Sequence, residues 1–343
     1  MNVQFYPGFS LYRLADDPVF VAPHSGPAFE IPTSRDDNSD TVASICWMKT
    51  GGALILSGIP RKAVAGIDFN RDIPPEKLSL SMWSDFLGDV HSDELASYRR
   101  RYAWVAKNSA DHEARLRIYN NFWGLVRKGN IVVFVHRKFT RMKNFPSMMD
   151  VITYQGRGVD NAIISDIVEK VNEKYADFFF KVEHKYKQAI LLEQQRVVDR
   201  IEGLFSGFSL KTMRLDYRKH VLEDMAVVRR FADRRFYKRL KHNFNKNNFM
   251  LACRSALKKP NVPGITVESI FKGSKARRSK APLFKRDHKI VMEVECNQFL
   301  GYWYPDVAAE IIVDILSRLR EVDAYSRLGM KQTHIGAFLH HGE

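Results

Sequence analysis

Two short apolar runs in this chain each end in a histidine, and they limit the fold more than any other feature. Residues 18–22 read Pro-Val-Phe-Val-Ala and lead into Pro23-His24, while residues 131–135 read Ile-Val-Val-Phe-Val and lead into His136. Runs of this length and composition are typical of buried strands. In open α/β sheets, ligands bind at the carboxyl ends of the strands. We therefore expect both histidines at the functional edge of a sheet.

Helix and strand signals alternate along the rest of the chain. A helical pattern begins at Asp40 and stops at Gly51-Gly52, and residues 53–57 are then typical of the next strand. Residues 290–296 alternate with period two, as a strand does. Further helical patterns cover residues 92–127, 161–175, 191–204 and 307–319. The alternation predicts an α/β fold with a mixed, largely parallel central sheet flanked by helices.

Length and composition narrow the class of protein. With 343 residues the chain can form one large domain or two smaller ones. It contains 45% hydrophobic residues but no run of about eighteen apolar ones, so we expect a soluble protein with no membrane partner. Residues 1–5 lack the cationic start of a secretory signal, which makes the cytoplasm the default location.

The three cysteines, Cys46, Cys253 and Cys296, are odd in number and far apart. This spacing argues against a disulfide framework and against a structural zinc site made of thiolates. Any zinc would be held by histidine and carboxylate.

The formal net charge of +15 is concentrated in one segment. Residues 211–290 hold 23 Lys+Arg against 6 Asp+Glu, which leaves the rest of the chain near −2. Within this segment, residues 273–280 form a Lys/Arg/Ser/Gly run that we interpret as a mobile loop. We divide the chain into residues 1–160 as the first part of an α/β hydrolase core, residues 161–285 as a helical, basic insertion, and residues 286–343 as the strand and helix that complete the core.

Five short stretches carry residues suited to metal-assisted hydrolysis. A catalytic zinc takes three nitrogen or oxygen ligands and keeps one position open for water. Period two places Glu293 and Glu295 on one strand face, where a carboxylate could accept a proton from that water. The stretches are Pro23-His24-Ser25-Gly26, Asp40, Asp68-Phe69-Asn70-Arg71, Val135-His136 and Glu293-Val294-Glu295-Cys296-Asn297-Gln298.

These stretches resemble the N-formylglutamate amidohydrolases, which are distant relatives of the zinc carboxypeptidases. Order and rough spacing agree over residues 18–72, 130–141 and 290–320, under half of the chain. The matching elements are Ala22-Pro23-His24-Ser25-Gly26, Asp40 with the helix into Gly51-Gly52, Ile59-Pro60-Arg61, Ile67-Asp68-Phe69-Asn70-Arg71, Val135-His136 with Phe139-Thr140, and Val294-Glu295-Cys296-Asn297-Gln298. The resemblance implies a zinc carboxypeptidase-like fold, into which the basic segment is inserted.

The resemblance also implies roles for individual residues. Zinc would be bound by His24, an acidic residue after it, and His136, with Glu295 as the group that handles the proton of the water. For the acidic ligand we favour Asp40, with Glu30, Asp36 and Asp37 as the alternatives. Asn70 and Arg71 would hold a carboxylate of the substrate, because a guanidinium binds carboxylate bidentately, and Arg61 would add a second positive group.

The sequence thus predicts a zinc-dependent hydrolase of an amide bond in a small carboxylate-bearing substrate, such as N-formylglutamate or another N-acyl amino acid. Two alternatives stay open. One is a metallocarboxypeptidase that acts on peptide C-termini. The other is a non-catalytic relative that binds nucleic acid or another polyanion through the basic segment, residues 211–290. The insertion could equally cover the active site or form an oligomer contact.

Overall fold

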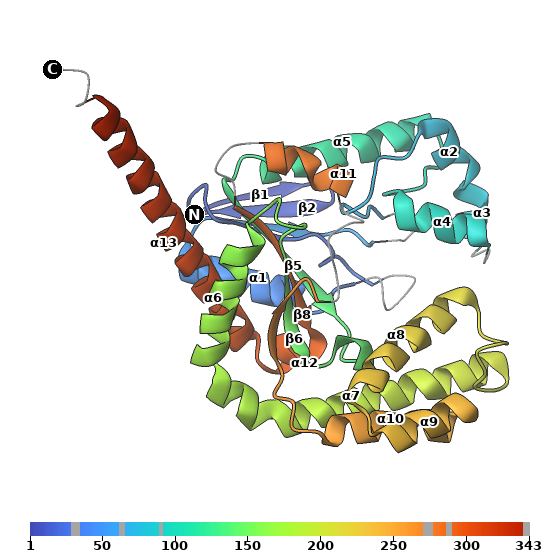
Figure 1. Cartoon of the computed structure of the whole chain (residues 1–343). Coiled ribbons are helices and arrows are strands. Elements are labelled where there is room, and N and C mark those ends of the chain that lie inside the picture. Colours follow the sequence, from blue (N-terminus) through green and yellow to red (C-terminus); the bar gives the residue numbers. More distant parts are fainter. Residues whose placement is uncertain (29–34, 62–65, 89–91, 270–276, 286–289, 339–343) are drawn as a thin grey trace.

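One mixed sheet organises the chain. The structure is a computed structural model that describes residues 1–28, 35–61, 66–88, 92–269, 277–285 and 290–338. Within these residues, eight strands form a single sheet in the order β1-β2-β4-β3-β5-β8-β6-β7 (Figure 1). The strands are β1 (Asn2–Tyr6), β2 (Phe9–Arg13), β3 (Val19–Ala22), β4 (Ala53–Ser57), β5 (Ile131–Lys138), β6 (Ser147–Ile152), β7 (Gly264–Val267) and β8 (Ile290–Asn297). The expected α/β class with a mixed, largely parallel sheet and flanking helices is confirmed.

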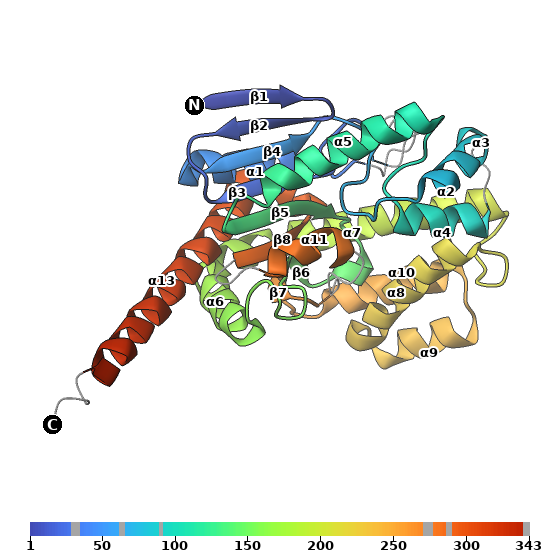
Figure 2. The same ribbon diagram turned by 90° about the horizontal axis from the view of Figure 1, so that it is seen from above.

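The parallel part of the sheet lies at its centre. Strands β4, β3, β5 and β8 run parallel to one another, with β3 paired to both β4 and β5 (Figure 2). These are the four strands that the sequence predicts, and every residue of β3 is buried. Val21 is the register partner of Phe134, so the carboxyl ends of β3 and β5 are adjacent. This adjacency brings His24 and His136 to one place.

The outer strands are not expected from the sequence. β1 and β2 form a hairpin across Gly8, which adopts a φ of +87°, and β2 pairs antiparallel with β4. β6 pairs antiparallel with β8, and β7 joins the other side of β6. Residues 264–267, near the end of the predicted basic insertion, residues 161–285, therefore belong to the central sheet.

Two of the helices lie in a segment that the sequence pattern predicts as a single helix. Residues 92–127 form α4 and α5 with an extended segment between them, because Tyr102 leaves the helical region and Asn108 caps the start of α5. The helices are α1 (Ser39–Thr50), α2 (Glu76–Ser81), α3 (Trp83–Leu87), α4 (Asp93–Arg101), α5 (Ser109–Val126), α6 (Asn161–Lys174), α7 (Ala176–Phe205), α8 (Leu215–Phe231), α9 (Arg234–His242), α10 (Lys246–Lys258), α11 (Arg277–Lys280), α12 (Gln298–Trp303) and α13 (Pro305–Phe338), with the short 3-10 helices η2 (Met142–Asn144) and η4 (Ala281–Lys285).

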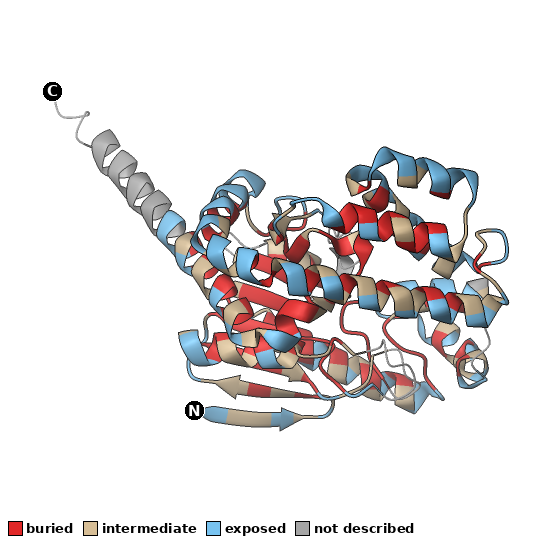
Figure 3. Cartoon of the chain, turned by 90° about the horizontal axis from the view of Figure 1, so that it is seen from below, coloured by how far each residue is buried: buried red, intermediate tan, exposed pale blue. Residues whose placement is uncertain are grey.

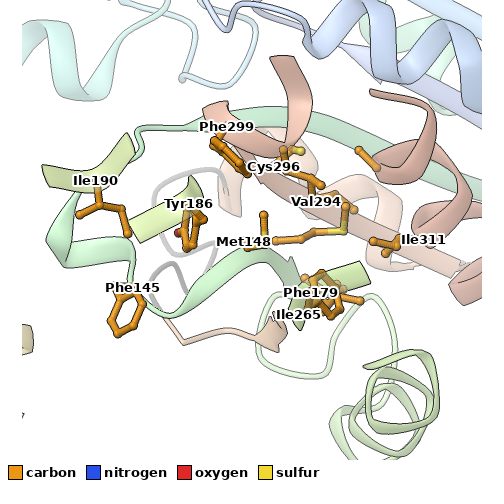
Figure 4. Close-up of a cluster of buried hydrophobic side chains, with 14 of the residues drawn as sticks. Phe145, Met148, Phe179, Tyr186, Ile190, Ile265, Val294, Cys296, Phe299 and Ile311 are labelled. Atoms are coloured by element: carbon orange, nitrogen blue, oxygen red, sulfur yellow. The ribbon is translucent and has the colours of Figure 1, made fainter. Parts of the chain in front are cut away.

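Both faces of the sheet are covered, and each has its own core. On one face, Phe122 and Trp123 of α5 pack over Phe134 of β5. The other face packs against α1, α6, α7, α12 and α13. Figure 4 shows part of this second core, where Tyr186 of α7 lies toward Phe299 of α12 and Ile311 of α13 lies near Val294 of β8. Figure 3 shows the central strands buried, whereas the edge strand β1 and the outer sides of the helices are exposed.

The basic helical segment does not have a separate core. Buried side chains of α7, α8 and α10, such as Val198, Val228 and Phe249, belong to the same hydrophobic cluster as Val294 of the sheet. Arg141, which precedes η2, also forms a buried ion pair of 2.5 Å with Asp224 of α8. The helices α7 to α10 are therefore attached to the sheet by apolar and ionic contacts.

Two further expectations concern membranes and cysteines. None of the helices in the described ranges is both long enough and apolar enough to cross a membrane. Cys46, Cys253 and Cys296 are buried free thiols, so the expected absence of disulfide bonds among them is confirmed.

Candidate metal centre

The turn after β3 fixes the position of His24. The Ser25 hydroxyl lies 2.9 Å from both the Ala22 and the Ser57 carbonyl oxygens, and so links the ends of β3 and β4. Gly26 passes so close to Ile59 that an added Cβ would lie 1.9 Å from the Ile59 carbonyl oxygen. Glycine is required there because any side chain would collide with backbone. The Pro-His-Ser-Gly motif is thus the local reason that His24 faces the site.

A histidine, an aspartate and a second histidine converge beyond the ends of β3 and β5. The Asp36 Oδ2 atom lies 3.1 Å from His24 Nδ1 and 2.8 Å from His136 Nδ1. All three residues are buried, and their potential ligand atoms lie within 4.8 Å of one another. Two imidazoles and one carboxylate in this arrangement could hold a metal ion.

The outer nitrogen of each imidazole has its own partner. His24 Nε2 lies 2.9 Å from Asp68 Oδ1, and His136 Nε2 lies 2.9 Å from the side-chain amide of Asn70. Both ring nitrogens of His24 face a carboxylate, but Arg61 Nη1, which can only donate, also lies 3.0 Å from Nδ1, so a neutral His24 carries its proton on Nε2 and presents a lone pair at Nδ1. Imidazoles that bind metals are commonly oriented by such outer partners.

The Asn70 amide has two orientations, and they differ in what they leave unpaired. With Nδ2 toward His136, the buried Asn70 Oδ1 atom has no hydrogen-bond partner. This orientation puts the His136 proton on Nδ1, toward Asp36. The rotated amide would let Oδ1 accept the His136 Nε2 proton and would leave a lone pair at His136 Nδ1, but it would place the amide nitrogen where Oδ1 now has no hydrogen-bond partner among the described residues. In that state both Nδ1 atoms direct lone pairs toward Asp36, where the Arg61 guanidinium supplies one positive charge and a metal ion would use the same lone pairs.

The acidic member of the cluster is Asp36, one of the sequence alternatives, and not the favoured Asp40. Asp40 begins α1 and pairs with Arg35 at 3.1 Å. Asp37 lies within 4.0 Å of both Arg35 and Arg137. Glu30 lies outside the described residues. The geometry therefore replaces Asp40 by Asp36, because the helix start turns Asp40 toward the Arg35 side chain.

Both expected arginines flank the cluster. Arg61 Nη1 lies 3.0 Å from His24 Nδ1 and 3.4 Å from Asp36 Oδ1, and Arg61 Nε lies 3.2 Å from Asp68 Oδ2. Arg71 approaches the same Asp68 oxygen through Nε at 3.5 Å, and its Nη groups make no hydrogen bond to the described residues. Asn70, by contrast, faces His136 and not an open position.

Charge stabilises the ionised form of both aspartates. Burial alone would raise the pKa of Asp36, but His24, His136 and Arg61 hold that pKa well below its usual range. Asp68 behaves in the same way, since His24, Arg71 and Arg61 outweigh the effect of burial on its pKa. Burial lowers the pKa of His136. The cluster therefore favours anionic carboxylates and a neutral His136, the forms that bind metals.

Glu295 lies beside the cluster in the adjacent strand. It is the register partner of His136 on β5 and of Asp150 on β6, so one row crosses three strands. Glu295 is partly exposed and makes no hydrogen bond to the described residues. Burial and the neighbouring carboxylates Glu293 and Asp36 raise the pKa of Glu295 well above its usual value. A carboxyl group with a raised pKa beside a candidate metal centre is suited to proton transfer.

Glu293, two residues earlier on the same strand face, is held by two other groups. Its Oε2 atom lies 2.5 Å from Lys280 Nζ and 2.8 Å from the Tyr154 hydroxyl. Lys280 and His136 lower the pKa of Glu293 to about 2 even though burial opposes this shift. Glu293 is therefore a fixed negative charge, which leaves Glu295 as the group on this face that can exchange a proton.

The sequence gives no signal for Lys280. It ends the run that composition suggests is a mobile loop, but residues 277–280 form α11 and Lys280 is fully buried. Its ammonium lies 4.0 Å from the centre of the Phe134 ring as well as beside Glu293. The interpretation of residues 277–280 as a mobile loop is therefore wrong.

Tyr154, the other partner of Glu293, adopts a φ of +60°, which is uncommon for a bulky residue.

Comparisons with known proteins add little to this geometry. No family model and no curated protein matches the chain. Among solved structures, the crystal structure of gene product Atu2144 from Agrobacterium tumefaciens is 11% identical, with a TM-score of 0.43, and the match covers 92% of this chain and 96% of that one. At this level of similarity we draw no conclusion from it.

Proposed function

We propose that this protein is a metal-dependent hydrolase of an amide bond, with His24, Asp36 and His136 as the metal ligands. The supporting observation is the approach of both Nδ1 atoms to Asp36 Oδ2, at 3.1 Å and 2.8 Å. When Asp68 accepts the Nε2 proton of His24, the Nδ1 lone pair faces Asp36 and the Arg61 guanidinium, and a metal ion would be bound through that same lone pair.

Zinc is the metal that we assign to this centre. Two imidazole nitrogens and one carboxylate oxygen, with a further position open, are a common ligand set of catalytic zinc. Zinc bound in this way polarises a carbonyl group and lowers the pKa of water toward neutrality. Affinity alone does not select zinc in a cell, so the assignment needs metal analysis of the purified protein.

The chain's own residues supply the remaining functions. Glu295 accepts a proton from water and later donates it to the leaving amine, since it is partly exposed and next to His136 across the sheet. Asp68 and Asn70 orient the two imidazoles. Arg71, whose Nη groups make no hydrogen bond to the described residues, binds a carboxylate of the substrate. The substrate is therefore a small carboxylate-bearing amide, such as an N-acyl amino acid.

Replacement of Glu295 by Gln tests the proposal. The Glu295→Gln variant should keep its metal, because Glu295 is not a ligand, and should lose about 100-fold or more in kcat on the best N-acyl amino acid. Glu310→Gln on α13 is the control, since that side chain is half-exposed and pairs with Lys49. Full turnover by Glu295→Gln would contradict the role. Activity on peptide C-termini instead would assign the same centre to a carboxypeptidase.

A further inference from the structure

Helix α9 presents a face made of five arginine or lysine side chains and one histidine. At 100° per residue, six of its nine positions fall within an arc of about 160°. These positions, called the α9 cationic face below, are Arg234, Arg235, Lys238, Arg239, Lys241 and His242. All six side chains are exposed, whereas Leu240 is buried and Phe236 and Tyr237 pack against the hydrophobic core. The apolar side of α9 thus fixes the helix to the protein and leaves the cationic side free.

This arrangement does not favour the stability of the helix. Arg234 and Lys238, like Arg235 and Arg239, are like charges four residues apart, which repel each other on a helix. The helix dipole disfavours Arg234 and Arg235 in the first turn and favours Arg239 and Lys241 in the last, so the cost of this face lies mainly in the repulsion between like charges. A face that carries these costs is better explained by an external anion than by the fold.

Nearby carboxylates neutralise little of this charge. Arg235 lies 3.6 Å from Asp233, but Arg234, Lys238 and Lys241 have no carboxylate within 4.0 Å among the described residues. Two exposed arginines, Arg229 and Arg230, end the preceding helix α8. Figure 2 shows α9 at the edge of the molecule, beyond α8 and α10. The positive charge therefore faces solvent and is accessible to a large partner.

The side chains on this face indicate which kind of polyanion fits. A helix that binds a lipid surface exposes an apolar face to it, but the apolar side of α9 is already packed. Single-stranded nucleic acid is bound by stacking on exposed aromatic rings, and the α9 cationic face has none. Cations alone suit a regular array of phosphates, and each strand of a duplex carries one phosphate per about 3.4 Å of helix axis.

We propose that the α9 cationic face binds the phosphate backbone of double-stranded nucleic acid without regard to base sequence. Nine helical residues span about 13 Å, which exceeds the axial spacing of phosphates, so the face can contact more than one phosphate of a strand. The site is separate from the metal centre and does not depend on the proposed hydrolase activity.

The test measures binding of the full-length protein to labelled duplexes of about 20 base pairs, one DNA and one RNA, over a range of salt concentrations. The variant is Arg234→Ala/Lys238→Ala/Lys241→Ala. Its matched control is Lys181→Ala/Lys185→Ala/Arg200→Ala, which removes three exposed cations from α7. Vesicles that contain phosphatidylserine serve as competitor.

The α9 variant should bind at least about tenfold more weakly at low salt, and the slope of log K against log salt should fall by about 2 to 3, while the control stays near wild type. Tighter binding to one of the two duplexes would identify the preferred nucleic acid. Equal weakening of both variants would overturn the proposal, because net charge alone would then explain binding. It would also be overturned if the wild type bound neither duplex, or if vesicles displaced the duplexes.

Discussion

The Lys280 ammonium lies 2.5 Å from the Glu293 carboxylate, and Lys280 has no exposed surface. A buried ion pair contributes little to stability compared with apolar residues of the same size, since both charges lose their hydration. The pair connects α11 with the strand that carries Glu295. We interpret it as a device that holds the acidic face of β8 in place beside His136.

Removal of one charge from this pair should strongly destabilise the protein. Lys280→Met leaves Glu293 buried without its cation, which costs about 3–5 kcal/mol. Lys280→Met/Glu293→Gln should recover most of the loss, because glutamine keeps an acceptor for Tyr154 without the charge. Denaturation by urea gives these free energies of unfolding. Lys174→Met, at the half-exposed pair with Asp314, is the control and should cost less than about 1 kcal/mol. A similar cost at both lysines would contradict this account.

The acid sensitivity of the protein should depend on Glu293. Its pKa falls from an ordinary 4.5 to about 2 on folding, so the folded state binds its proton more weakly than the unfolded state. The contribution of Glu293 to stability is then complete above pH 4.5 and is lost as the pH falls toward 2. The free energy of unfolding should decline less steeply over this range in Lys280→Met/Glu293→Gln than in wild type. Equal slopes would exclude Glu293 as a contributor.

Gly26 should not tolerate alanine. The added Cβ would lie 1.9 Å from the Ile59 carbonyl oxygen, so the turn that carries His24 must move. We expect a loss of about 2 kcal/mol or more and weaker metal binding, measured by thermal unfolding and by metal titration. Gly124→Ala is the matched control. It lies inside α5 with no atom near its Cβ position, and should stabilise the protein by about 0.5–1 kcal/mol. A neutral Gly26→Ala would show that the close approach is unimportant.

The sequence predicts the centre of the sheet well and its edges poorly. Strands β3 and β5 are buried on both faces, and their continuous apolar runs need no polar partners to fill such positions. The edge strand β1 is half-exposed, and β6 carries the polar residues Ser147 and Asp150 although it is buried. Their polar side chains find partners in distant segments, such as Thr266 for Asp150, which no local pattern reveals.

The sequence predicts those residues of the candidate site that lie at the ends of buried strands. His24 and His136 follow from the ends of two apolar runs. The sequence does not decide between Asp36 and Asp40 as the acidic ligand, because both lie in or next to a loop. The structure decides, since Asp40 pairs with Arg35 and Asp36 contacts His24. Lys280 is the opposite case, since the composition of residues 273–280 suggests exposure to solvent, whereas its buried partner Glu293 lies on β8.

Metal content of the purified protein tests the central claim most directly. Elemental analysis should find about one zinc per chain in wild type and in Asp40→Asn, and almost none in Asp36→Asn, since Asp36 alone of these two contacts both histidines. His24→Ala/His136→Ala should lose the metal as well. A wild-type protein without metal after reconstitution with zinc, or an Asp36→Asn variant that keeps it, would contradict the metal centre proposed here.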